Sequence, residues 1–196
     1  MNVENQFFPK SILVKFALMQ SPPVLKTALN YGALSGLVSF IVFLLLYWMH
    51  FNPLGPASWL GAWVPILFMI LATRHYRKYE NGGFLPYWNG FRIGFLTACA
   101  SAFVFGALTW FFVTYVDGEI LDRFKQESLE AMELTEGMMV SLVGESAFEQ
   151  SVQSITNMDM FEVTSSDIFN KVLGGLLSAL IVAAFLKREP NFQEEE

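Results

Sequence analysis

Residues that usually carry chemistry are scarce in this sequence. Cysteine occurs once, at Cys99, and histidine twice, at His50 and His75. One cysteine excludes a disulfide within the chain. Neither histidine has a second histidine or a cysteine at the spacing of zinc ligands, and Gly82-Gly83 lack the following Lys-Ser/Thr pair of a phosphate-binding loop. We therefore expect no catalytic residues, no cofactor and no metal, and a protein that is not an enzyme.

Charge is also missing over long stretches. Asp, Glu, Lys and Arg are absent between Lys26 and Arg74, between Arg92 and Asp117, and between Lys171 and Lys187. A helix that crosses a bilayer needs about 20 predominantly apolar residues, and soluble cores rarely contain such runs. The sequence thus predicts an all-α, polytopic membrane protein, a bundle of four transmembrane helices with an amphipathic helical segment between the third and the fourth.

The apolar runs place the spans and the segments between them. The second span is the least regular, because its strong apolar run, 59–72, is short and contains Pro65, which should kink the helix. It reaches membrane length if 53–58 enters the interface. The first three spans fall within 28–116 and the fourth is 168–186. The other segments are 1–27, a basic loop at 74–89, an acidic segment at 117–167 and a tail at 187–196.

Basic residues gather on one side of the predicted spans. Nine of the twelve lie in segments that share a side: Lys10, Lys15, Lys26, Arg74, Arg77, Lys78, Arg92, Lys187 and Arg188. Because loops rich in Lys and Arg stay in the cytoplasm, we expect both termini and the loop 74–89 there. Before the first span, Phe7–Gln20 is expected either as a short helix on the membrane surface or as a frayed tail.

The acidic segment 117–167 is expected on the other side. It holds twelve acids and two bases, a net charge of −10, and this argues against nucleic-acid binding, which needs a basic face. Apolar and small residues recur in it at three- and four-residue spacing, which predicts one or two amphipathic helices on the bundle or the bilayer; disorder is the alternative. The apolar stripe suggests a partner surface formed by Leu121, Phe124 and Met132.

Small residues recur at four-residue spacing in three of the spans. The third span carries Gly90, Gly94, Ala98, Ala102 and Gly106, the first Gly32 and Gly36, and the fourth Gly175 and Ala179. In lipid, such faces allow helix backbones to approach closely. Two interpretations are open: these faces pack the bundle internally, or one of them docks a partner subunit or a second copy. The third span, being longest, is the candidate for such docking.

Two stretches and the order of features resemble a known family. The stretches are Leu25–Gly32 with Gly36, and Asn81–Phe84 leading into Trp88–Gly94. Together with the acidic helical segment and a last span ending in Lys187-Arg188, they are similar to a bacterial inner-membrane family catalogued as domain of unknown function 4199. The resemblance covers nearly all of the chain after Val24. It implies four spans in a bacterial inner membrane, and it brings no functional residues because the family has no established activity.

These observations favour a non-enzymatic membrane subunit or scaffold of an envelope complex. Its expected partners are membrane lipids and either another protein or a second copy. The alternative is a dimeric transporter or lipid-handling protein for an envelope lipid or a polyprenyl-linked sugar. Its support is the predicted kink at Pro65 and the polar ends at Arg92 and Lys171.

Overall fold

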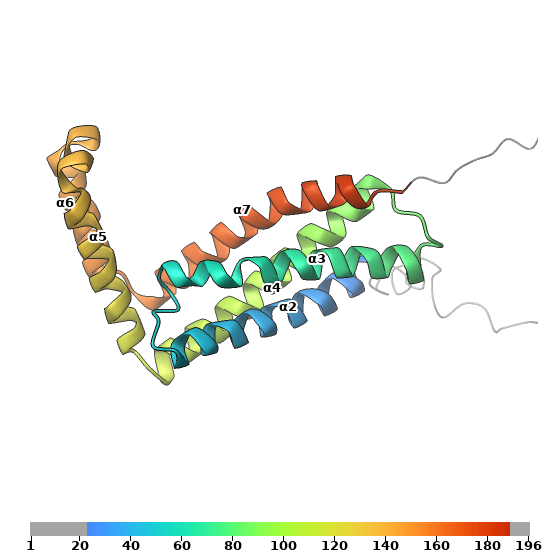
Figure 1. The fold of residues 1–196 in the computed structure, drawn as a ribbon, viewed down its shortest axis with the longest axis horizontal. Coiled ribbons are helices and arrows are strands. Elements are labelled where there is room, and N and C mark those ends of the chain that lie inside the picture. Colours follow the sequence, from blue (N-terminus) through green and yellow to red (C-terminus); the bar gives the residue numbers. More distant parts are fainter. Residues whose placement is uncertain (1–22, 189–196) are drawn as a thin grey trace, which may run out of the picture.

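The computed structural model describes residues 23–188, and this part of the chain is almost entirely helical (Figure 1). The expected surface helix Phe7–Gln20 lies outside the described residues. In chain order the elements are α2 (Pro23–Trp48), the 3-10 helix η1 (Pro56–Gly61), α3 (Trp63–His75), the π-helix η2 (Tyr76–Glu80), α4 (Tyr87–Tyr115), α5 (Glu119–Val143), α6 (Glu145–Asn157) and α7 (Met160–Leu186). The predicted all-α class is confirmed.

Four segments are long and apolar enough to cross a membrane. They are Pro23–Trp48, Pro56–Glu80, Tyr87–Tyr115 and Met160–Leu186. The helices run side by side along one axis, and the described ends of the chain lie together at one end of the bundle (Figure 1). The protein is therefore a multi-pass membrane protein built on four helices, as the sequence predicts.

The second span reaches membrane length by growing at both ends of its apolar run. The chain enters it as η1 and continues beyond α3 as η2, so much of the expected basic loop 74–89 is helical and only residues 81–86 link the second and third spans. Pro65 is the third residue of α3, in the first turn, where backbone N–H groups have no partner within the helix and proline is tolerated. The helix type changes from 3-10 to α at Ala62, three residues before the position where the kink is predicted.

The core is arranged around α4, which packs against α2, α3 and α7. At one end Phe43, Val113 and Ile120 form its centre, with the Phe43 and Phe112 rings edge to face at 5.9 Å. Small residues dominate halfway, where Met69 fills the space beside Ala98 and Ala179. The core of the bundle is therefore aromatic at one end and built on small residues in the middle.

The acidic segment is an ordered helical hairpin. The chain turns between α5 and α6 at Gly144, whose positive φ of 87° suits glycine, which has no Cβ. The hairpin stands at a steep angle to the bundle axis (Figure 1). The last span begins at Met160 rather than at residue 168, because Asp159 and Glu162 form a capping box in which the Glu162 N–H donates to Asp159 Oδ1 at 2.7 Å.

Loop 81–86 is fastened to the end of α7 at the bundle end opposite the hairpin. Leu85 and Arg188 exchange backbone hydrogen bonds of 2.8 and 2.9 Å. Arg77 Nη1 donates to the Leu186 carbonyl at 3.3 Å, which satisfies a helix-terminal acceptor. The link holds the second and fourth spans together beyond their apolar parts.

Candidate functional site

The small-residue stripe of α4 is buried against α7. A Cβ added to Gly94 would lie 3.1 Å from Ala179 Cβ, and one added to Gly175 would lie 2.4 Å from Ala98 Cβ. Near the hairpin, a Cβ on Gly106 would lie 2.6 Å from Ile168 Cδ1. Gly90 faces Ala183, and Ala102 is 2% exposed. The two backbones therefore approach at distances that larger side chains would prevent.

The glycines of α2 serve a second contact on another side of α4. A Cβ on Gly32 would lie 2.5 Å from Ala100 Cβ, and one on Gly36 would lie 2.7 Å from Val104 Cβ. Next to them, Ser101 Oγ donates to Ser35 Oγ across the interface at 2.8 Å. All the predicted packing residues thus lie inside the bundle, and of the two interpretations open from the sequence, internal packing is the one that fits this geometry.

The predicted partner surface on the hairpin is divided. Leu121 and Phe124, at the base of α5, pack against the buried cluster around Phe43 and Ile120. They are part of the bundle core and are not a free face, because the base of α5 lies across the end of the bundle. Met132, two turns farther along, is half-buried.

A polar contact holds the hairpin to the bundle. Asn52 Nδ2, in the loop after α2, donates to Glu127 Oε2 at 3.1 Å, and Asn52 Oδ1 accepts from the Leu54 N–H at 3.1 Å. Gly55 allows the approach, since a Cβ there would be 2.8 Å from Glu127 Oε2. These residues are not singled out by the sequence, and the Asn52-Pro53 turn beside a glycine is the only signal that could have drawn attention to them.

The far half of α5 exposes an apolar face. Leu134, Met138 and Leu142 are 88%, 68% and 73% exposed. At 3.6 residues per turn they lie within about 80° of Ile120 and Phe124 around the helix. The face that packs on the bundle therefore continues along α5 without a partner among the described residues. Helical spacing from Phe124 identifies this continuation, although the predicted partner surface includes only Leu121, Phe124 and Met132.

Acids occupy the other sides of this part of the hairpin. Glu133 and Glu136, exposed on α5, fall more than about 100° from Met138 around the helix. The hairpin 119–157 carries eight acids and two bases, a net charge of −6. The arrangement keeps the hairpin soluble on the sides that face water, while one face stays apolar.

The other residues considered from the sequence are dispersed. Arg92 is exposed at the end opposite the hairpin, with its guanidinium 5.5 Å from the Trp88 ring. Lys171 pairs with Asp167 on α7. His75 lies between Tyr31 and Tyr79, with ring centroids 5.5 and 4.9 Å away, and His50 is exposed on the turn after α2. Within residues 23–188, no group of three or more His, Cys, Asp or Glu is placed to hold a metal.

Comparisons with known proteins identify the family. The sequence model described as "Protein of unknown function (DUF4199)" matches residues 30–188. Comparison with curated proteins and with solved structures gives no match. The matched part begins in α2 and ends after α7, so it contains all four spans and the hairpin. The chain belongs to the family of proteins of unknown function DUF4199, as the resemblance in its Gly-rich stretches indicates.

Proposed function

We propose that the protein is a non-enzymatic subunit of a membrane complex and that α5 binds the partner. The observation that carries the proposal is the exposed apolar face of α5 at Leu134, Met138 and Leu142. Burial of such a face stabilises an interface, whereas exposure to water is unfavourable. The small-residue faces are used inside the bundle, which leaves the hairpin as the surface for assembly.

The direction of the hairpin indicates the kind of partner. The hairpin crosses one end of the bundle and extends past α7 (Figure 1). Its apolar face is the one that packs on the bundle at Ile120 and Phe124, so its continuation faces the membrane side. A second integral membrane protein standing beside α7 would lie beneath this overhang. We propose such a protein as the partner, with an apolar surface that the acids of the hairpin surround.

The orientation belongs to the same proposal. Seven basic residues lie at the bundle end opposite the hairpin: Lys26, Arg74, Arg77, Lys78, Arg92, Lys187 and Arg188. The positive-inside rule places that end in the cytoplasm. We propose a bacterial inner membrane, with both termini in the cytoplasm and the hairpin on the far side of the bilayer.

A pull-down from native membranes tests the subunit proposal. The tagged full-length chain would be extracted in mild detergent, and its companions identified and quantified by mass spectrometry. We expect one stoichiometric membrane protein with the wild type. A triple variant, Leu134→Ser, Met138→Ser and Leu142→Ser, should recover at least tenfold less of this partner, because three exposed apolar side chains are replaced by hydroxyls.

Val143→Ser is the matched control, since Val143 is 53% exposed but lies about 140° from Met138 around α5. It should retain the partner. Recovery of the chain alone or as a homo-oligomer, or equal recovery of the partner by the triple variant, would contradict the proposal.

A further inference from the structure

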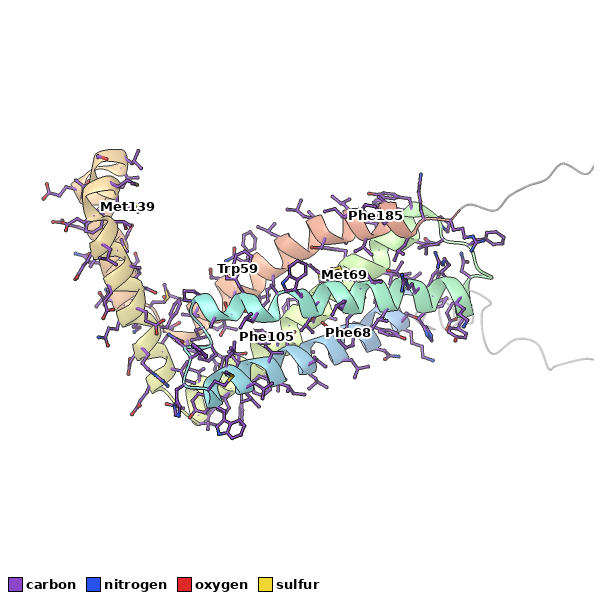
Figure 2. The ribbon with its side chains drawn as sticks, in the orientation of Figure 1. Trp59, Phe68, Met69, Phe105, Met139 and Phe185 are labelled. Carbon is purple, nitrogen blue, oxygen red and sulfur yellow. The ribbon has the colours of Figure 1, made fainter. Side chains whose placement is uncertain are left out.

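A cavity of about 430 Å³ lies between α2, the second span, α4 and α7, in the half of the bundle nearer the hairpin. Its size falls within the range of roughly 300–1,000 Å³ typical of small-molecule sites. Phe43 and Leu46 form the wall on α2, and Met69 and Phe105 form parts of the walls on α3 and α4. Figure 2 labels Met69, Phe105 and Trp59 along this part of the bundle. The lining is mainly apolar.

The mouth of the cavity opens between the second span and α7. The strongly exposed lining residues come from these two elements only: Ser58, Trp59 and Ala62 on one side, and Asn170 and Gly174 on the other. The lining residues of α2 and α4 are buried or half-buried. Both sides of the mouth belong to membrane-spanning segments. The mouth therefore faces the lipid phase of a membrane that these segments cross.

Polar groups stand at two depths of this cavity. Lys171 and Asp167 form an ion pair on its α7 side, and Lys171 Nζ lies 4.2 Å from the centre of the Phe105 ring. On the α2 side, Ser39 is 6% exposed and its hydroxyl has no hydrogen-bond partner within residues 23–188. Thr97 of α4, by comparison, donates to the carbonyl four residues before it. A buried hydroxyl without a partner is unfavourable, so a polar atom of a ligand that reached Ser39 would be stabilised there.

We propose that the cavity binds a zwitterionic phospholipid, with an acyl chain inside and the headgroup at Lys171 and Asp167. The lateral mouth selects an amphiphile, and the apolar walls suit a hydrocarbon chain. The two charges stand four residues apart on α7. A zwitterionic headgroup places its phosphate at the Lys171 ammonium and its own ammonium at the Asp167 carboxylate. A purely anionic headgroup would be attracted by Lys171 but repelled by the carboxylate of Asp167.

This inference is independent of the partner on the hairpin, and it names a ligand for the lipid-handling alternative expected from the sequence. Native mass spectrometry tests it. The full-length chain would be stripped of lipid, then given equal amounts of phosphatidylethanolamine and phosphatidylglycerol in detergent. We expect one phosphatidylethanolamine retained per chain, with at least a fivefold preference over phosphatidylglycerol.

Two variants locate the site. Gly174→Leu should reduce retention at least tenfold, because a Cβ there meets no atom within 4 Å and the side chain can occupy the mouth without disturbing the fold. Lys171→Met should abolish the preference between the two lipids. Ala184→Leu, which adds an isopropyl group at an exposed position on α7 away from the cavity, should retain lipid as the wild type does.

The outcomes separate the parts of the proposal. Unchanged retention in Gly174→Leu, with a melting curve like that of the wild type, would show that lipid binds elsewhere and overturn the site. Equal retention of both lipids by the wild type would overturn the zwitterionic headgroup. Retention of phosphatidylglycerol alone would make the ligand an anionic lipid and overturn it as well.

Discussion

Gly174 and Gly175 are neighbours on α7 with opposite surroundings. A Cβ on Gly175 would overlap Ala98 Cβ at 2.4 Å, while one on Gly174 meets nothing within 4 Å. Gly175 is therefore needed for the contact between α7 and α4. Gly174 is not, and its smallness instead leaves the cavity mouth open. Sequence alone cannot make this distinction, because both residues belong to one run of small side chains.

This difference gives a prediction about stability. Gly175→Ala should lower the free energy of unfolding by about 1–3 kcal/mol, because α7 and α4 must separate to admit the methyl group. Gly174→Ala should leave it unchanged or raise it by up to about 1 kcal/mol, since alanine favours helix. Unfolding of the two purified variants in detergent, followed by circular dichroism, measures both. Equal free energies of unfolding for the two variants would contradict the close approach of α7 to α4 at Gly175.

At the scale of the element, the hairpin is fixed by its base. Ile120 is fully buried, whereas the far half of α5 has no buried residue. The bond from Asn52 to Glu127 lies between these regions. The direction of the far part of the hairpin therefore depends on a few contacts near its base.

Loss of the Glu127 carboxylate should therefore loosen the hairpin. Glu127→Ala leaves the amide of Asn52, which is 9% exposed, without its acceptor, at a cost of about 1 kcal/mol. We expect faster hydrogen exchange in residues 119–130 and around Asn52, with exchange in α4 unchanged. Glu130→Ala is the control, because among the described residues the Glu130 side chain accepts a hydrogen bond only from Gln126 of its own helix. Equal exchange in the two variants would show that Asn52 does not hold the hairpin.

At the scale of the whole molecule, the sequence predicts the spans well and their ends poorly. Long uncharged runs are a strong signal, because the bilayer requires them. The second span was predicted too short, since Arg74, Arg77 and Lys78 suggest a loop, although basic side chains are well placed at a helix C-terminus. The start of α7 is predicted eight residues late for a similar reason: its first turns are polar and suggest a loop, whereas the capping box at Asp159 and the burial of Met160 and Val163 keep them helical.

The candidate sites were predicted less completely than the fold. The small-residue faces follow from spacing, and so does an apolar stripe on the acidic segment. Which part of that stripe stays free depends on where α5 crosses the bundle, and this angle is set by distant residues such as Asn52 and Gly55. The cavity joins residues from four helices, and a single sequence carries no signal for such a meeting.

The charges at the two ends of the molecule predict its orientation, and labelling with a membrane-impermeant maleimide measures it. Cys99 is the only cysteine, so a Cys99→Ser chain provides an unreactive background. Cysteines would be introduced singly for Ser146, exposed on the hairpin, and for Glu80, exposed at the opposite end. In right-side-out spheroplasts of a bacterial host, Ser146→Cys should react at once. Glu80→Cys should react only after lysis, because the seven basic residues at its end hold it in the cytoplasm. The reverse pattern would place the hairpin in the cytoplasm, and the partner proposed for α5 would then have to present its binding surface on that side.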